Sequence, residues 1–168
     1  MKILIAEDDH DTAMQYKAIL ESRDHHVTIT ENGEDCLNAY YNELSQSDPK
    51  NCSPFDAVVL DYRMPKKDGM EVAKEVITIS PRQRIIFASA YVRETLVDSV
   101  KQLNQIVELM QKPFELDALV DTIEDIEIYK ELEKLNANVL QIKNSGPTHE
   151  EVRDLLEGLR QIQKGRTF

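Results

Sequence analysis

The stretch FDAVVLDYRMPKKDG, residues 55–69, decides the fold of this chain. Its first six residues predict a short strand that ends directly before Asp61. Met64-Pro65 and Asp68-Gly69 punctuate the loop that follows, and a helix is predicted over 70–79. An acidic residue therefore stands at the carboxyl end of a strand, in a loop that leads into a helix.

Four more runs of strand length lie on either side of this stretch. They are KILIA at 2–6, VTIT at 27–30, RIIFA at 84–88 and IVELM at 106–110. The first has no polar alternation, which is typical of a strand buried on both faces, as in a parallel sheet.

Helical segments separate these strands. They lie at 12–22, with Asp11 or Thr12 as the N-cap, at 35–44, at 70–79, at 92–103 and from 116 onward. The segment SQSDPKNCSP at 45–54 is a loop by composition. Strand and helix alternate five times, which predicts an α/β fold, with a parallel sheet covered by helices on both faces.

Polar residues follow four of the predicted strands. They are Glu7, Asp8 and Asp9 after the first strand, Asp61 after the third, Ser89 after the fourth and Lys112 after the fifth. Sites in open parallel sheets lie beyond the carboxyl ends of the strands. Each residue alone fits a plainer role, such as a helix cap or a surface lysine, but their joint placement favours one site.

Clustered carboxylates repel one another and favour a bound cation. Oxygen ligands without His or Cys favour Mg²⁺ or Mn²⁺ over zinc. A carboxylate can also act as a nucleophile and form an aspartyl phosphate. Lys112 can supply a positive charge to the phosphoryl oxygens, and Ser89 a hydroxyl donor.

Four motifs together resemble the receiver domains of bacterial and archaeal two-component systems. They are ILIAEDD at 3–9, VVLDYRMPKKDG at 58–69, IIFASA at 85–90 and QKPF at 111–114. The resemblance covers about residues 1–124. It implies a doubly wound, flavodoxin-like five-stranded sheet in the order 2-1-3-4-5, and a response regulator that is not a conventional enzyme.

The resemblance also implies roles for individual residues. Asp61 is expected to accept a phosphoryl group from a histidine kinase. Glu7, Asp8, Asp61 and the backbone carbonyl of Arg63 are expected to hold Mg²⁺ (or Mn²⁺), whereas Asp9 matches a variable neighbour that is not a ligand. Ser89 matches a switch hydroxyl and Lys112 a phosphate-binding lysine. The Lys112-Pro113 bond resembles one that is often cis in the family.

Three positions, Leu109, Tyr91 and Arg63, change what the resemblance implies. Leu109 stands where the family usually has Tyr or Phe, so the usual coupling of a hydroxyl to a swinging aromatic ring is not expected here. Tyr91, two residues after Ser89, is a candidate substitute. Arg63 and Tyr91 are large side chains that flank the site, and we expect them to slow loss of the phosphoryl group to water.

The chain beyond the receiver motifs predicts more helix. An apolar seam at residues 116, 119, 123 and 126 is expected to pack on the sheet, and a second seam at 128, 132, 135, 139 and 142 faces elsewhere. Residues 144–147 break the helix, and Thr148 with Glu151 forms a capping box before a last helix. We therefore divide the chain into a receiver domain, 1–126, and a helical hairpin, 127–168.

Three roles for the hairpin remain open from the sequence. It could form a dimer or bind a protein partner through 128–162, in a coiled coil or four-helix bundle. It could fold back on its own domain. As the alternative function, a transcription regulator could use it on DNA, although no helix-turn-helix with a basic second helix is present.

Composition excludes some classes of function. The net charge is -11, which opposes general nucleic-acid binding by the whole molecule. No apolar run approaches the roughly 18 residues of a membrane span. The apolar N-terminal run is too short for a signal peptide, and the two cysteines suggest reduced thiols, so we expect a soluble cytoplasmic protein. A phosphatase with a second Asp two residues after the nucleophile is disfavoured, because that residue is Arg63.

Overall fold

The computed structural model describes residues 1–47, 53–90, 103, 105, 107–127, 130, 153 and 154. The strands are β1 (Lys2–Ala6), β2 (His26–Thr30), β3 (Ala57–Leu60), β4 (Ile85–Ser89) and β5 (Val107–Gln111). The helices are α1 (His10–Glu21), α2 (Gly33–Gln46), α3 (Gly69–Ile79) and α5 (Leu116–Glu124). All five predicted strands are confirmed to within two residues at each end. The helix predicted over 92–103 lies outside the described residues, except for Leu103.

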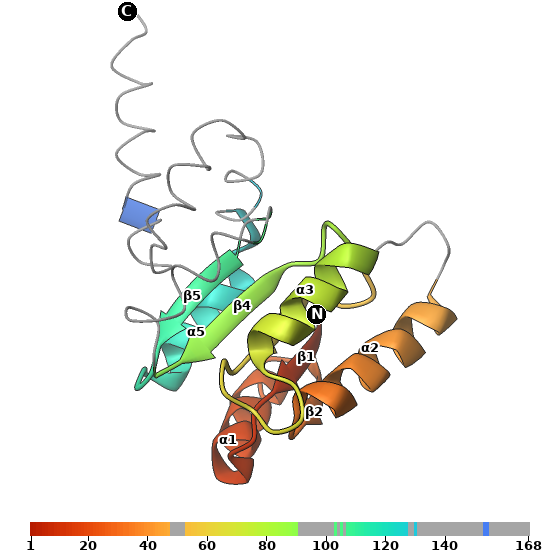
Figure 1. The fold of residues 1–168 in the computed structure, drawn as a ribbon. Coiled ribbons are helices and arrows are strands. Elements are labelled where there is room, and N and C mark those ends of the chain that lie inside the picture. The colour runs from red at the N-terminus through yellow and green to blue at the C-terminus, as the bar shows by residue number, and fades with distance from the viewer. Residues whose placement is uncertain are drawn as a thin grey trace, which may run out of the picture.

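The five strands form one parallel sheet in the order β2-β1-β3-β4-β5. This order confirms the doubly wound α/β fold. Helices α2 and α3 cover one face, and α1 and α5 cover the other (Figure 1). The carboxyl ends of all the strands therefore meet at one edge of the sheet.

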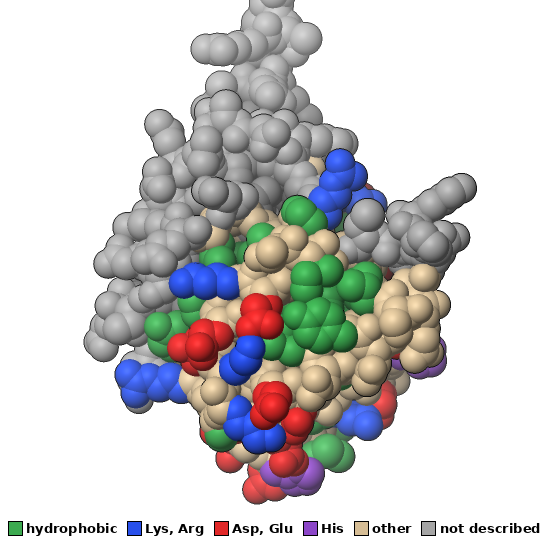
Figure 2. All heavy atoms as spheres, turned by 45° about the vertical axis from the view of Figure 1, so that its right-hand side comes forward, with side chains coloured by type: hydrophobic (Ala, Val, Ile, Leu, Met, Phe, Trp, Pro, Cys, Tyr) green, Lys and Arg blue, Asp and Glu red, His purple; other side chains and the backbone are tan. Residues whose placement is uncertain are grey.

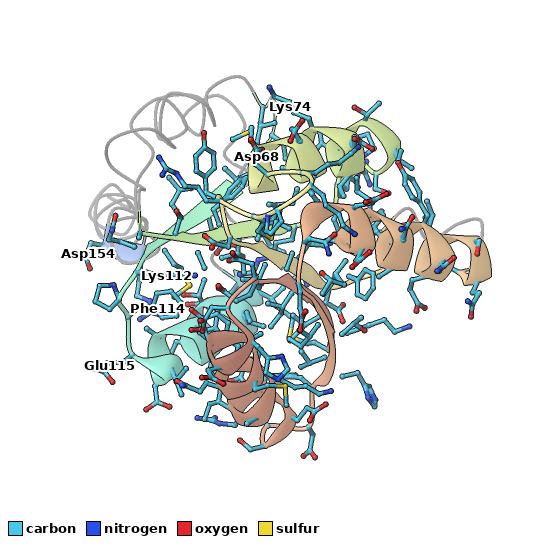
Figure 3. The ribbon with its side chains drawn as sticks, turned by 60° about the horizontal axis from the view of Figure 1, so that its bottom comes forward. Asp68, Lys74, Lys112, Phe114, Glu115 and Asp154 are labelled. Atoms are coloured by element: carbon cyan, nitrogen blue, oxygen red, sulfur yellow. The ribbon has the colours of Figure 1, made fainter. Side chains whose placement is uncertain are left out.

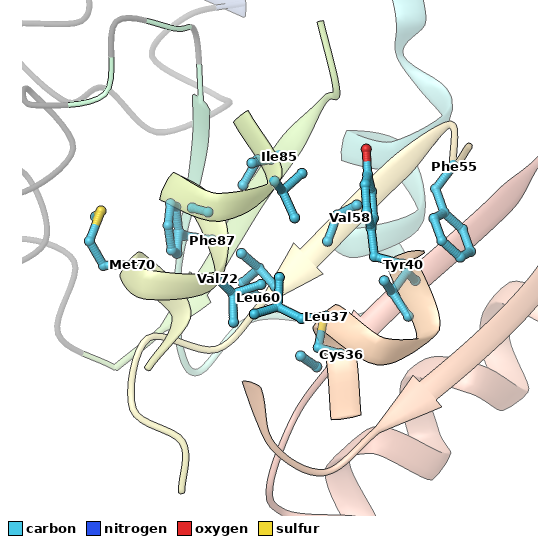
Figure 4. Packing of buried hydrophobic residues seen from close by; sticks show 14 of the residues in the cluster. Cys36, Leu37, Tyr40, Phe55, Val58, Leu60, Met70, Val72, Ile85 and Phe87 are labelled. Carbon is cyan, nitrogen blue, oxygen red and sulfur yellow. The ribbon is translucent and has the colours of Figure 1, made fainter. Parts of the chain in front are cut away.

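Two apolar layers hold the helices on the sheet. On one face, side chains of α2 and α3 pack on alternate residues of β1, β3, β4 and β5, around Tyr40, Leu60 and Phe87 (Figure 4). On the other face, side chains of α1 and α5 pack on the remaining residues of the central strands, around Ile5 and Ile86. A strand buried on both faces must be apolar at consecutive positions, which explains the unbroken apolar run in β1.

The first two helices begin earlier than predicted. Asp9, and not Asp11 or Thr12, caps α1, because its carboxylate accepts a 2.7 Å hydrogen bond from the Thr12 amide. Asn32 caps α2 through a 2.9 Å bond from the Asp35 amide, so the helix begins at Gly33. In both cases a polar residue in the short turn after a strand serves as the cap.

Helix α5 ends at Glu124, whereas the sequence predicted one continuous helix from 116 onward. Residues 126, 127 and 130 are helical again, so the helix is interrupted at Asp125. The backbone of Asp125 leaves the helical region, with ψ at 66°. Ile126, assigned to the buried seam, is 37% exposed, so the inclusion of Ile126 in that seam was wrong. Leu119 and Ile123 of the same seam are fully buried on the sheet, as predicted. The second seam and the loop at 144–147 lie outside the described residues.

Side chains of both signs are mixed over the face that α2 and α3 present, around a small apolar patch (Figure 2). Among the described residues, the large apolar side chains that are exposed are Met14, Tyr41, Ile79 and Ile126. Within the part of the chain that the structure describes, no helix has both the length and the apolar character that a membrane span requires.

Candidate functional site

Backbone hydrogen bonds continue past the strand ends and fix the residues at the carboxyl edge of the sheet. The Glu7 amide donates to the Thr30 carbonyl at 3.0 Å, and the Asp61 amide donates to the Ala6 carbonyl at 2.9 Å. The Lys112 amide donates to the Ser89 carbonyl at 2.9 Å. Glu7, Asp61 and Lys112 are thus held by the same ladder that holds the sheet. Figure 3 shows Lys112 at this edge, on the segment that leads through Phe114 to α5.

Three carboxylates meet at this edge. Glu7, Asp8 and Asp61 each offer an oxygen, and these oxygens all lie within 4.8 Å of one another. Glu7 is buried, Asp61 is half-buried and Asp8 is exposed, so the cluster opens to solvent on one side. The sequence predicted this juxtaposition from the strand ends alone.

Lys112 reaches into the cluster from the loop between β5 and α5. Its ammonium donates to Glu7 Oε2 at 2.5 Å and lies 3.6 Å from Asp61 Oδ2. Burial raises the pKa of the Asp61 carboxyl above its ordinary value of 3.8, and the charge of Lys112 opposes that rise. Burial likewise raises the pKa of Glu7, again against the hydrogen bond from Lys112. A single cation therefore offsets charge on two partly desolvated carboxylates.

Asp9 belongs to helix α1 and not to the cluster. The hydrogen bond from Thr12 lowers the pKa of its carboxyl, as expected for a cap that stays ionised. Its own amide lies 3.4 Å from Glu7 Oε1, which helps to orient the buried glutamate.

The other predicted site residues lie at the end of a strand, in the core, in a loop or outside the described residues. Ser89 is the last residue of β4 and is fully buried, and the strand register places it beside Gln111, which precedes Lys112. Leu109 is buried under α3 beside Phe87, so its side chain packs in the core. Tyr91 lies outside the described residues. Arg63 lies in the loop between β3 and α3.

The loop after Asp61 is closed by its own backbone. The Gly69 amide donates to the Tyr62 carbonyl at 2.9 Å, and the Tyr62 amide donates to Asp61 Oδ1 at 2.7 Å. A Cβ on Gly69 would lie 2.2 Å from the Asp61 carbonyl oxygen, so only glycine fits at the base of this loop. Asp68 then caps α3 with a complete capping box.

An aromatic pair lies beside the site, and its contact was not predicted. Tyr16 of α1 stacks on Phe114 with ring centroids 5.7 Å apart. Burial, and the negative charges of Glu7 and Asp61, raise the pKa of the Tyr16 hydroxyl. An open groove of about 590 Å³ runs past these rings and Lys112 to Leu116. Sequence periodicity placed Tyr16 on the buried face of its helix but could not show what it meets.

The donor set of the cluster fits a hard divalent cation. Its ligand atoms are carboxylate oxygens from three residues, without His or Cys, and one face is open to water. Mg²⁺ prefers oxygen ligands and retains several waters, so it suits a cluster of this kind.

Comparison with known proteins identifies the family. The model of the response regulator receiver domain matches residues 3–124, and the chain therefore belongs to this family. Residues 3–124 thus form a receiver domain of the kind found in two-component response regulators, as the motifs predicted. The Lys112-Pro113 bond, expected to be cis from the resemblance, is cis.

Individual relatives agree with this assignment. The response regulator receiver protein CpdR of Brucella abortus is 31% identical over 123 residues, which cover 73% of this chain and 93% of that protein. The chemotaxis protein CheY of Bacillus subtilis is also 31% identical, with the same coverage. The transcriptional regulatory protein RprY of Bacteroides fragilis is 30% identical over 128 residues, but that match covers only 49% of it.

Solved structures share the fold. A CheY-like receiver domain from Methanospirillum hungatei superposes with a TM-score of 0.66 at 21% identity, over 79% of this chain and 97% of that one. The response regulator TrrA of Thermotoga maritima, solved in complex with Mg²⁺ and BeF, gives a TM-score of 0.57 at 24% identity, over 73% of this chain and 96% of that one.

Proposed function

We propose that Asp61 accepts a phosphoryl group from the phosphohistidine of a histidine kinase. One oxygen of the Asp61 carboxylate forms a bond to phosphorus while the bond from phosphorus to the imidazole nitrogen breaks. The electron pair leaves with the imidazole, which returns to its ordinary protonation equilibrium. The product is an aspartyl phosphate on this chain.

The contact of Lys112 with two carboxylates is the observation that carries this proposal. A lysine 3.6 Å from Asp61 and 2.5 Å from Glu7 can pair with an incoming phosphoryl oxygen at the cost of one existing contact. Ser89, at the end of the neighbouring strand, is the proposed hydroxyl donor to another oxygen. Both groups approach from β4 and β5, on one side of Asp61 in the sheet.

Glu7, Asp8, Asp61 and the carbonyl of Arg63 are the proposed ligands of Mg²⁺. The bound ion would supply positive charge to the phosphoryl oxygens as negative charge is redistributed. The carboxylates themselves repel an incoming phosphoryl group, so their charge must be offset before transfer. The structure of TrrA with Mg²⁺ and BeF supports the choice of ion by likeness of fold.

We propose that residues 127–168 form a separate helical extension that carries the output. The second apolar seam predicted from the sequence, at 128, 132, 135, 139 and 142, supports this proposal, because an apolar stripe on a helix needs a surface to pack against. One described contact joins the two parts, because Arg153 lies 3.1 Å from the Asp125 carboxylate at the end of α5. This ion pair would hold the last helix near the point where the extension leaves the receiver domain.

The phosphoryl-transfer proposal is tested with acetyl phosphate and Mg²⁺. The wild-type chain should gain the mass of one phosphoryl group, and Asp61→Asn should gain none. Asp11→Asn is the matched control, because Asp11 is an exposed aspartate in the first turn of α1 at the same edge of the molecule. Equal labelling of Asp61→Asn and the wild type would show that the phosphoacceptor is another residue.

A further inference from the structure

The loop that follows Asp61 rests against the first turn of α2. A Cβ on Gly33, the first residue of that helix, would lie 2.3 Å from the Lys67 carbonyl oxygen and 2.7 Å from Lys67 Cβ. The φ of Gly33 lies outside the left-handed region. Glycine is therefore needed here because the backbones approach closely, and not because of an unusual conformation.

A second contact joins the same two segments. Lys66 has a positive φ of 66°, in the left-handed region that non-glycine residues rarely adopt. Its ammonium lies 3.4 Å from the Glu34 carboxylate and 3.7 Å from that of Asp35, both in the first turn of α2. The tip of the loop is thus held by α2 through one backbone contact and one charged side chain.

The first turn of α2 is itself fixed. Asn32 is largely buried and accepts a hydrogen bond from the Asp35 amide, while its own amide group donates to the Asp35 carboxylate at 2.6 Å. Gly33 and Cys36 are buried. A capped and packed helix terminus of this kind is a firm support for a loop.

The loop at 62–69 is short, and a backbone hydrogen bond closes it. A displacement of its tip, at Lys66 and Lys67, must therefore displace its base, at Tyr62 and Gly69. The Gly69 amide and the Tyr62 carbonyl close the loop, and the Asp61 backbone abuts Gly69. Arg63, whose carbonyl is a proposed ion ligand, lies between the closed base and the supported tip. The position of Lys67 is therefore connected to the position of two proposed ligands.

We infer that the first turn of α2, through Gly33, is a positioning element for the phosphoacceptor loop. This inference rests on the proposed function of Asp61. A side chain at position 33 pushes Lys67 outward by the few tenths of an ångström or more that a Cβ requires. The Arg63 carbonyl and the Asp61 carboxylate then leave their places relative to Glu7 and Asp8.

The test compares Gly33→Ala with Val76→Ala. Val76 is fully buried in α3 on the same face of the sheet, so its truncation destabilises the same core without changing a residue of the loop. Each protein is titrated with Mg²⁺ alone. Amide hydrogen exchange of residues 62–69 is measured in the metal-free protein, and the rate of labelling by acetyl phosphate is measured last.

Gly33→Ala should bind Mg²⁺ about tenfold more weakly and label about tenfold more slowly, because misplacement of reacting groups by a fraction of an ångström has effects of this order. Exchange over 62–69 should be faster in the metal-free variant. Val76→Ala should match the wild type in all three measurements. Lys66→Met, which removes only an exposed ion pair, should give a small change in the same direction, up to about threefold.

Two different failures are distinguishable. If the wild-type chain neither binds Mg²⁺ nor becomes labelled, the proposed function is wrong. If the wild type does both, and Gly33→Ala behaves like Val76→Ala while Lys66→Met behaves like the wild type, α2 has no positioning role. If Gly33→Ala does not fold, the test rests on Lys66→Met. Unchanged amide exchange over 62–69 in Lys66→Met would then contradict the inference.

Discussion

At the scale of single residues, the site carries more negative than positive charge. Three carboxylates and one ammonium meet where Glu7 and Asp61 are partly shielded from water. Burial raises the pKa of both carboxyls, so negative charge is unfavourable there in the metal-free protein. A bound cation, or neutralisation of Asp61, would therefore stabilise this site.

This imbalance predicts how stability depends on pH. A carboxyl whose pKa is raised on folding binds more protons in the folded than in the unfolded protein. Its contribution to the free energy of unfolding is therefore lost as pH rises from the ordinary value, 3.8 for Asp61, through the raised value. Asp61→Asn should be more stable than the metal-free wild type at neutral pH, by on the order of 1 kcal/mol.

Denaturant unfolding at a series of pH values without Mg²⁺ measures this difference. The gap between Asp61→Asn and the wild type should be smallest near pH 4, widen with rising pH and then level off. Saturating Mg²⁺ should reverse its sign, because the ion stabilises only the protein that retains the carboxylate. A gap that is constant over the whole range would contradict the account of the Asp61 charge.

At the scale of elements, a buried ion pair sets the end of α5. Arg84, just before β4, binds Glu108 of β5 through two hydrogen bonds of 2.7 and 3.0 Å. The same guanidinium donates to the carbonyls of Thr122 and Ile123, at 2.5 and 2.8 Å. The last carbonyls of a helix have no hydrogen-bond partners within the helix. Arg84 donates to two of these carbonyls, so α5 can end at Glu124.

Removal of this pair should change both stability and helix length. Arg84→Met leaves Glu108 buried without its partner and should cost about 3–5 kcal/mol in unfolding free energy. In the double variant Arg84→Met with Glu108→Leu, most of that loss should be recovered. Amide exchange of Ile126 and Glu127 should slow in the double variant, because the freed carbonyls can then accept bonds from a longer helix.

Chemical denaturation and amide exchange measure these two effects. Arg82→Met is the matched control, since Arg82 is an exposed arginine two residues earlier. A double variant that remains as unstable as the single one would show that the ion pair itself stabilises the fold. Unchanged exchange at Ile126 would show that another feature ends the helix.

The elements show what could be predicted from the sequence and what could not. Strands and their site residues were predictable, because apolar runs and the residues that end them are local features. The cap of α1 was missed because Asp9, Asp11 and Thr12 are all good caps, and only the end of β1 selects among them. The end of α5 depends on Arg84, which lies about 40 residues earlier in the sequence, so no local pattern could show it.

The same distinction applies to the site. Glu7, Asp61 and Lys112 converge because parallel strands end at a common edge, a consequence of topology that the sequence pattern implies. The support of the loop by Gly33 was not predictable, because it depends on how closely α2 approaches residue 67. Contacts between elements of different layers require the packed structure.

At the scale of the whole molecule, the site and the exit of the extension lie at opposite ends of α5. The helix starts four residues after Lys112 and ends at Glu124, and the next residue, Asp125, pairs with Arg153. A change at Asp61 can reach residue 125 through α5, or through β4 and β5. At the site, Ser89 ends β4 and Lys112 follows β5. At the opposite ends of the same strands, Arg84 precedes β4 and Glu108 lies near the start of β5. The extension proposed at 127–168 would then be placed to report the state of the site.

We therefore predict that the phosphorylated state alters assembly. Light scattering with Mg²⁺ and a beryllofluoride mimic should show a larger mass than the unliganded chain, because a shift in the packing of α5 would reorient the predicted seam at 128–142 for pairing. Asp61→Asn, which cannot hold the mimic, is the control and should not change. A mass that stays constant in the wild type would separate the extension from the site and leave a different protein as its partner.

The most direct measurement of the central claim locates the phosphoryl group. After labelling with acetyl phosphate and Mg²⁺, borohydride reduction converts an aspartyl phosphate to homoserine, which peptide mass spectrometry assigns to one position. The account predicts homoserine at position 61 and nowhere else. Homoserine at Asp8 or at another carboxylate, or a labelled chain that yields no homoserine, would contradict it.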